Sequence, residues 1–160
     1  MQIRLNELRK LLANKDLRGK SIVLVGGTFD ILHSSHIDFL EQSKSFGDIL
    51  IVVLASDKEV RKRKGNDRPI QNQRERAKVI STLKPVDFVF ISDLSAYSDK
   101  IISMLNPSTI VFSLDGGKAL YRRKYKRKIE KSFPKVRVEI IDTPRLSTSV
   151  IINKILKLNK

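Results

Sequence analysis

The sequence predicts a single α/β domain built on a doubly wound, mainly parallel sheet of five strands with helices on both faces. Short runs rich in valine and isoleucine alternate with longer segments of helical periodicity, which is the pattern of parallel strands joined by helices. Several of these runs are continuously apolar, as expected of strands that are covered on both faces. The 160 residues suit one domain, 1–160, and show no internal repeat or linker.

Local signals place each element of this fold along the chain. The expected strands are 21–25, 49–54, 86–91, 109–113 and 136–141. The expected helices are 34–46, 71–83, 96–104, 118–132 and 147–158. A further helix at 3–14 is expected within an N-terminal helical extension, residues 1–18, that precedes the first strand.

Composition narrows the classes of function. The chain has no cysteine, which excludes disulfides, thiolate metal sites and cysteine nucleophiles. No apolar stretch approaches the roughly 20 residues needed to span a bilayer, and the first residues do not form a signal-peptide core, so we expect a cytoplasmic protein without a membrane partner. The 32 Lys and Arg against 17 Asp and Glu give a formal net charge of +15, which favours anionic partners such as nucleotides, phosphorylated metabolites or nucleic acid.

Much of the positive charge lies in two clusters. Residues 61–63 are expected to form a mobile basic loop, and a second cluster runs through 122–131 on a predicted helix, with Tyr121 and Tyr125 interleaved. The second cluster is compatible with an RNA-binding face. Because charge runs usually serve solubility, a solvated helix face is the favoured interpretation.

The stretch GGTFDILHSSH, residues 26–36, brings chemistry-bearing side chains to the end of the first predicted strand. Its two glycines let the backbone approach a ligand closely. Ligands of an open parallel sheet bind at the carboxyl ends of the strands, and the start of the following helix favours anions. Both histidines of the chain, His33 and His36, flank that helix start, so a phosphate chain is the expected occupant. Core histidines are the alternative, and a metal site is disfavoured because a third ligand is lacking.

The same stretch resembles the GTFD and HxGH signatures of the nucleotidylyltransferase superfamily. Three further stretches follow in the order of that family, namely FGDILIVVLASDKEVRKRKG, RPIQNQRERAKVISTLKPVDFV and LSTSVIINKI. The resemblance covers nearly the whole chain and is nearest to heptose-1-phosphate adenylyltransferase, glycerol-3-phosphate cytidylyltransferase and archaeal FAD synthase. It implies a Rossmann-like fold.

The resemblance also implies a reaction. Such an enzyme transfers AMP from ATP, or CMP from CTP, to a small phosphorylated acceptor and releases pyrophosphate, with Mg²⁺ as cofactor. The protein's task is then to hold two polyanions together and to neutralise the charge that grows on the leaving pyrophosphate. The alternative is a member of the same fold with weakened catalysis that binds nucleotide or RNA. Relatives are commonly dimers, and a homodimer is compatible with this sequence.

Four residues match family positions that contact the reacting groups. By resemblance, His33 and His36 contact the α-phosphate, and Lys64 faces the phosphate of the acceptor. Arg76 corresponds to an arginine that contacts the phosphates of the nucleotide, with Arg74 as the competing choice.

Other residues match nucleotide-binding positions. Gly27, Thr28 and Phe29 shape the turn after the first strand, and the threonine is expected to donate a hydrogen bond to phosphate. Asp30 either binds Mg²⁺ or fixes the turn as an Asx-type aspartate.

Two stretches near the end of the chain supply three more positions. By resemblance, Asp115 in VFSLDGG lies near the nucleotide or the acceptor. Ser147 and Thr148 open the final helix, where backbone N–H groups and hydroxyls are expected to receive the β- and γ-phosphates, with ordinary N-capping as the alternative.

The chain departs from the family pattern at informative places. Ser35 replaces the HxGH glycine and adds a side chain in the first helical turn, where phosphate is expected to pass. Ser113 and Leu114 replace family glycines. The stretch DTPRLSTS lacks the arginine that cytidylyltransferases carry in RTEGIST, which favours ATP over CTP.

Overall fold

The computed structural model describes residues 19–114, 119–142 and 147–158, together with Met1, Glu7 and Lys10. The strands are Ile22–Gly27 (β1), Ile49–Ala55 (β2), Phe88–Ser92 (β3), Thr109–Ser113 (β4) and Arg137–Ile141 (β5). The helices are Ser34–Lys44 (α2), Asp57–Lys64 (α3), Gln73–Ser81 (α4), Asp99–Leu105 (α5), Ala119–Ser132 (α6) and Thr148–Leu158 (α7). Most of the helix expected at 3–14 lies outside the described residues.

The five strands form one parallel sheet in the order β3-β2-β1-β4-β5. β1 pairs with β2 along its whole length, but with β4 only over Val23–Val25. The strand order reverses between β1 and β4, and the carboxyl ends of the strands at such a switch point form a crevice. This arrangement confirms the predicted Rossmann-like, doubly wound fold.

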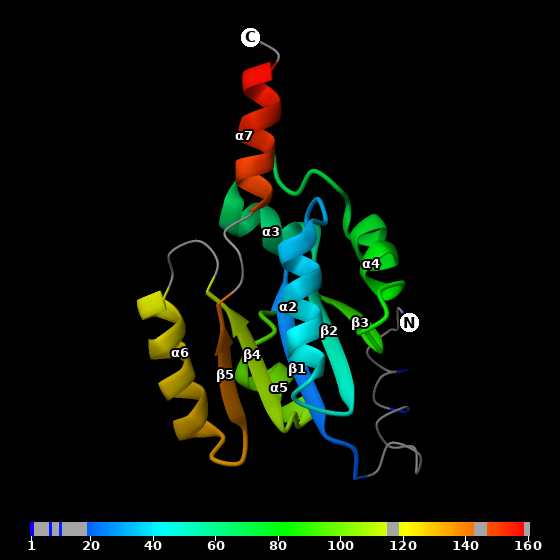
Figure 1. Cartoon of the computed structure of the whole chain (residues 1–160). Helices are drawn as coiled ribbons and strands as arrows, with labels where there is room; N and C mark the ends of the chain where they lie inside the picture. The colour runs from blue at the N-terminus through cyan, green and yellow to red at the C-terminus, as the bar shows by residue number, and fades with distance from the viewer. Residues whose placement is uncertain (2–6, 8–9, 11–18, 115–118, 143–146, 159–160) are drawn as a thin grey trace.

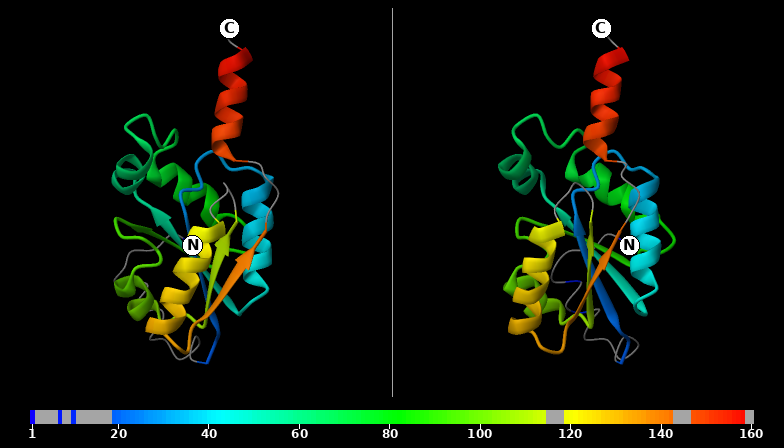
Figure 2. Two further views of the ribbon diagram at one scale, coloured as in Figure 1. Left: turned by 90° about the vertical axis from the view of Figure 1, so that its left-hand side faces the viewer. Right: turned by 60° about the vertical axis from the view of Figure 1, so that its left-hand side comes forward.

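Helices cover both faces of the sheet, which therefore lies between two apolar cores (Figures 1 and 2). Because successive side chains of a strand point to opposite faces, Leu24 of β1 belongs to one core, while Val23 and Val25 belong to the other. The Leu24 core is closed by α5 and α6, and the second core by α2 and α4. All seven residues of β2 are buried, as the continuously apolar run predicts.

Residues 61–63 form the last turn of α3, so the expectation of a mobile basic loop was wrong. The helix begins after Ser56, whose hydroxyl accepts a hydrogen bond from the N–H of Glu59 at 3.2 Å. Acidic side chains lie in its first turn and basic ones in its last, which suits the helix dipole. It ends at Gly65, whose φ of 95° lies in the region that favours glycine.

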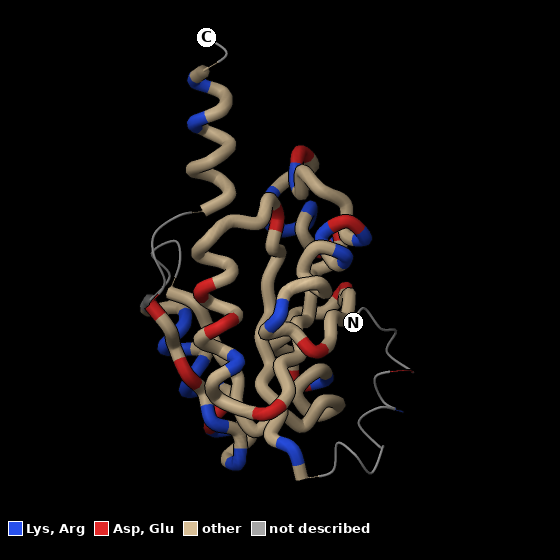
Figure 3. Tube along the Cα trace, turned by 45° about the vertical axis from the view of Figure 1, so that its right-hand side comes forward, with Lys and Arg blue, Asp and Glu red and all other residues tan. Residues whose placement is uncertain are grey.

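Helix α6 is rich in basic residues, and helix α7 exposes apolar side chains. Basic residues follow one another along α6, as they do in the last turn of α3 (Figure 3). α7 projects from the carboxyl edge of the sheet and leaves Val150, Ile155, Leu156 and Leu158 at least half exposed (Figure 1). No helix among the described residues has the length and apolar character to cross a membrane.

Candidate active site

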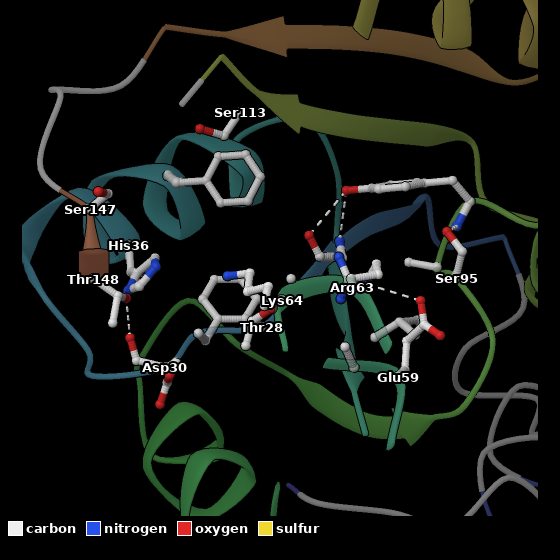
Figure 4. Close-up of a pocket in the computed structure, with 18 of the residues that line it drawn as sticks. Thr28, Asp30, His36, Glu59, Arg63, Lys64, Ser95, Ser113, Ser147 and Thr148 are labelled. Atoms are coloured by element: carbon white, nitrogen blue, oxygen red, sulfur yellow. Dashed lines mark hydrogen bonds and ion pairs between the residues drawn. The ribbon is translucent and has the colours of Figure 1, made fainter. Parts of the chain in front are cut away.

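A cavity of about 810 Å³ opens at the carboxyl edge of the sheet, beside the switch point between β1 and β4. Its walls come from the end of β1, the start of α2, the end of α3, the connection before α5, the first half of α6 and the start of α7. In Figure 4, labelled side chains from these elements surround one space. Its volume lies in the range of about 300–1,000 Å³ typical of small-molecule sites.

Gly26 and Gly27 end β1 at this cavity, and their own protein neighbours explain why they are glycines. A Cβ built on Gly26 would lie 2.3 Å from the Cβ of Ala96, and one on Gly27 would lie 2.5 Å from the ring of Phe29. A close approach to ligand was the expected reason, but the crowding comes from the chain itself. Both residues line the cavity.

Tyr97 closes the gap that opens where β1 parts from β4. Its hydroxyl accepts a hydrogen bond from the N–H of Gly26 at 3.0 Å and donates to the carbonyl of the same residue at 3.1 Å. The ladder between β1 and β4 ends one residue earlier, at Val25. The tyrosine therefore satisfies backbone groups of Gly26 on the side where β4 no longer pairs with β1, and its ring becomes part of the cavity wall.

The loop between β1 and α2 is held in a strained shape. Phe29 and Ile31 have φ values of 48° and 49°, which non-glycine residues seldom adopt. Between them, the buried carboxylate of Asp30 accepts hydrogen bonds from the guanidinium of Arg68 at 2.7 and 3.0 Å and from the N–H groups of Ile70 and Gln71. These contacts over-determine the loop, as strained functional loops require.

Asp30 is therefore a turn-fixing residue in this geometry. Burial alone would raise the pKa of its carboxyl, but the hydrogen bonds from Gln71, Ile70 and Arg68 outweigh burial and hold the pKa below its ordinary value of 3.8. Both carboxylate oxygens are engaged with protein donors, so they do not fit a role as Mg²⁺ ligands. The described residues include no group of three His, Cys, Asp or Glu side chains arranged to hold a metal ion.

The two histidines lie together at the start of α2, as the motif predicts. His33 is the N-cap residue, and its ring stacks on that of His36 with centroids 3.8 Å apart and an interplanar angle of 22°. The ring of Phe29 meets His36 edge-on at 5.2 Å. Burial, followed by the charges of His33 and Lys64, lowers the pKa of His36 from 6.5 to about 4, so this imidazole is neutral near pH 7.

Helix α3 contributes basic side chains to the cavity wall. Lys64, its last residue, lines the cavity as expected, and so does Arg63 (Figure 4). Arg63 Nε lies 3.0 Å from a carboxylate oxygen of Glu59, one turn earlier. This side of the cavity therefore offers cationic groups to an anion.

Arg76 is not part of the cavity wall. Its side chain is completely buried, and its guanidinium donates to the carbonyls of Gln71, Thr28 and Ala55 at 2.6 to 2.9 Å. It also pairs with Asp57 at 2.7 Å. The expected contact between Arg76 and the phosphates of a nucleotide does not fit this position, because the guanidinium is used to tie together the ends of β1 and β2, the start of α3 and the segment before α4.

The start of α7 reaches the cavity from the opposite side. Ser147 and Thr148 both line the cavity, and Thr148 is the first helical residue. Its hydroxyl donates to the carbonyl of Asp30, which joins α7 to the strained loop. The hydroxyl of Ser147 accepts a weak hydrogen bond, at 3.4 Å, from the N–H of Val150, as an N-cap does. Asp115 lies outside the described residues.

Part of the cavity wall is aromatic and consists of Tyr97, Tyr121 and Tyr125, to which no individual role in the site was assigned from the sequence. The rings of Tyr97 and Phe112 lie 4.3 Å apart, and those of Tyr121 and Tyr125 lie 5.3 Å apart. Arg122, which lines the same cavity, places its guanidinium 5.1 Å from the centre of the Phe112 ring. The tyrosines interleaved with the basic residues of α6 are visible in the sequence, but that cluster was interpreted as a solvated helix face, with an RNA-binding face as the alternative. No local signal in the sequence marks Tyr97.

Comparison with known proteins identifies the family. The sequence pattern of the cytidylyltransferase-like family matches residues 24–155, from β1 into α7. The chain belongs to the cytidylyltransferase-like family. This confirms the family resemblance noted in the sequence.

Several cytidylyltransferase-like relatives resemble the chain closely. It is 42% identical over 151 residues to the bifunctional protein HldE of Campylobacter jejuni subsp. doylei, covering 93% of this chain and 30% of the relative. It is 48% identical over 93 residues to an FAD synthase of Thermococcus sibiricus, covering 58% of this chain and 62% of the relative. The chain thus spans less than two thirds of either relative.

Solved structures agree with this family. A lipopolysaccharide core biosynthesis protein from Thermoplasma volcanium is 30% identical, with a TM-score of 0.61, and the match covers 81% of this chain and all of that one. A pantothenate synthetase from Thermus thermophilus has a TM-score of 0.67 over 91% of this chain and 63% of that one. At 12% identity, the second likeness concerns the fold alone.

Proposed function

We propose that the chain transfers AMP from ATP to a small phosphorylated acceptor and releases pyrophosphate. The observation that carries this proposal is the shared cavity, which the stacked His33–His36 pair and the basic end of α3 both line. Two anionic substrates bound at these two places lie within one enclosure. Such proximity is the main contribution a protein makes to a transfer that needs no covalent enzyme intermediate.

In the proposed reaction, an oxygen of the acceptor's phosphate attacks the α-phosphorus of the nucleotide. A new P–O bond forms there, while the bond from the α-phosphorus to the oxygen that bridges to the β-phosphate breaks. That oxygen leaves with pyrophosphate, which carries the charge. His36, neutral near pH 7, donates a hydrogen bond to a phosphate oxygen, and Lys64 balances negative charge on the acceptor side. The start of α7 receives the leaving phosphates.

Mg²⁺ enters this proposal with the nucleotide. The ion binds nucleotide phosphates readily and keeps several of its waters, so it does not need a cage built by the protein. This fits the engagement of both Asp30 oxygens by Arg68 and by backbone N–H groups. The described residues then bind the phosphate oxygens that the ion leaves free.

The base and the acceptor are the open parts of the proposal. We favour ATP because DTPRLSTS lacks the arginine of the cytidylyltransferase motif. For the acceptor, the cavity supplies cationic groups next to the rings of Tyr121 and Tyr125, which suit a phosphate monoester with a ring-shaped portion. Flavin and sugar phosphates both have that character.

The test is a pyrophosphate-release assay with ATP or CTP, Mg²⁺ and a panel of glycerol 3-phosphate, FMN, phosphopantetheine and sugar 1-phosphates. We expect release with ATP and with one class of ring-bearing acceptor. His36→Ala is expected to lower turnover by orders of magnitude while the thermal unfolding midpoint stays close to that of wild type. No release from either nucleotide across the panel would refute the proposal. Nucleotide binding without turnover, or tight and salt-sensitive RNA binding, would support the weakened, binding-only alternative.

A further inference from the structure

Helix α2 contains two buried serines whose hydroxyls are in different situations. Ser43, fully buried, donates a hydrogen bond to the carbonyl of Phe39 four residues earlier, at 2.6 Å. This is the usual way in which a serine inside a helix satisfies its hydroxyl. Ser35, 5% exposed, is in the first turn, and its hydroxyl has no hydrogen-bond partner among the described residues.

An unsatisfied buried hydroxyl is rare because its desolvation is costly, so each case calls for a specific reason. Ser35 lines the cavity, and it lies between His33 and His36 in the sequence. A ligand in the cavity is therefore in a position to supply the missing partner. The first turn of α2 contains no acidic residue, and its N-cap side chain makes no capping hydrogen bond. No carboxylate of the first turn and no N-cap side chain therefore competes with a ligand oxygen for the hydrogen-bond donors at the start of α2.

We propose that the hydroxyl of Ser35 donates a hydrogen bond to an anionic oxygen of the nucleotide's phosphate chain. This contact rests on the proposed function, and it assigns a binding role to a side chain at the position where the resembling family has glycine. The bond adds a donor to those that the start of a helix already directs at an anion.

The charges around the cavity favour an anionic partner for this hydroxyl. Lys64 contributes a positive charge that is felt at His36, one residue from Ser35. The buried carboxylate that lines the cavity, that of Asp30, is paired with Arg68. A hydroxyl that donates to a charged oxygen forms a stronger bond than one that donates to a neutral acceptor.

The opposite effect of Ser35 is steric obstruction, and the two effects predict opposite results for glycine. If the side chain narrowed the passage for phosphate, Ser35→Gly would bind nucleotide more tightly. If the hydroxyl is a donor, Ser35→Gly and Ser35→Ala both bind nucleotide more weakly. The cavity keeps a volume of about 810 Å³ with the serine in place, which favours the donor.

The experiment measures binding by calorimetry, separately from turnover. The probes are a non-hydrolysable ATP analogue with Mg²⁺, and adenosine. Ser35→Ala is expected to raise the Kd of the analogue about five- to thirty-fold, because a hydrogen bond to a charged group is lost, and to leave the Kd of adenosine unchanged. Ser34→Ala, a change at the exposed serine next to it, is the matched control and should bind like wild type.

The outcomes separate this contact from the proposed function. Unchanged binding of the analogue by Ser35→Ala, or tighter binding by Ser35→Gly, overturns the contact, as does a wild-type chain that does not bind the analogue. An equal loss for adenosine also overturns it, because the change would then not concern phosphate. A wild-type chain that binds the analogue and releases no pyrophosphate overturns the proposed function alone.

Discussion

At the scale of single residues, the site depends on a histidine that its surroundings keep neutral. Burial is the largest cause of the low pKa of His36, and the charges of His33 and Lys64 act in the same direction against the weaker attraction of Asp30. A neutral imidazole can donate one hydrogen bond and keep an acceptor nitrogen. A bound triphosphate adds negative charge nearby, so we expect nucleotide binding to raise the pKa of His36.

The low pKa of His36 also makes the fold sensitive to acid. The native state, with a pKa of about 4, binds fewer protons than the unfolded state, with a pKa near 6.5, so stability falls as the pH drops through this window. By linkage, the free energy of unfolding at pH 5 should be at most about 2 kcal/mol lower than at pH 7 through this one group. We expect His36→Gln, followed by urea unfolding at both pH values, to show a smaller loss than wild type.

Carboxylates titrate alike in both proteins, so only the difference between the two pH dependences counts in this comparison. The pKa of the Asp30 carboxyl is lowered from its ordinary value of 3.8, so this group titrates below the window from pH 5 to pH 7. Equal losses in wild type and His36→Gln would show that the imidazole is not held neutral by the fold.

At the scale of elements, the sequence predicts well those strands and helices that local hydrophobic periodicity determines. Each expected strand overlaps an observed one, because continuous runs of Val and Ile fit the interior of a parallel sheet. The missed element is α3, although its start signal, Ser56 followed three residues later by Glu59, is visible. The basic residues 61–63 that follow were interpreted as a loop, whereas they lie in the last turn of the helix, where the helix dipole favours positive charge.

Contacts between distant segments explain what the sequence did not predict about the site. The position of Tyr97 depends on Gly26, 71 residues away, whose backbone its hydroxyl satisfies. Helix α5 begins at Asp99 rather than at residue 96 because Ser98 caps it, so Tyr97 lies before the helix, in the cavity wall. The structural role of Arg76 likewise depends on hydrogen bonds to the carbonyls of Thr28 and Ala55, which are distant in sequence and belong to no motif that contains Arg76.

Arg76 is expected to act on the shape of the site and on stability, through the elements that it joins. Lysine keeps the charge but lacks the fork of donors, so Arg76→Lys removes the hydrogen bonds to the part-buried carbonyl of Thr28 and the buried carbonyl of Ala55. We expect the free energy of unfolding to fall by about 2–4 kcal/mol, as measured by urea titration.

Arg74 gives a matched control for this change. It lies on the same helix, is exposed, and was the competing choice for a phosphate contact. Arg74→Lys should unfold like wild type. If Arg76→Lys kept full stability and lost only affinity for nucleotide, Arg76 would be a ligand-binding residue and not a structural clamp.

At the scale of the whole molecule, positive charge is placed unevenly with respect to the cavity. The formal net charge is +15, and basic residues follow one another along α3 and α6 (Figure 3). Both helices also contribute residues to the cavity wall. Charges of one sign around a cleft raise the local concentration of oppositely charged ligands, and salt weakens this effect. The same charges were compatible with an RNA-binding face, but the cavity that they flank suits a small polyanion.

The charge near the cavity should therefore matter for nucleotide capture more than equal charge elsewhere. Arg123 and Lys124 flank Arg122 and Tyr125 on α6 without lining the cavity themselves. The double change of both to glutamine should lower kcat/KM for ATP about two- to five-fold at low ionic strength, and the loss should disappear near 0.3 M salt, where the Debye length is short. The control removes the same charge at Lys84 and Lys135, exposed residues just before β3 and β5 at the opposite edge of the sheet, and should change kcat/KM little. Equal losses in both double variants would mean that total charge, and not its placement around the cavity, determines how fast the nucleotide is captured.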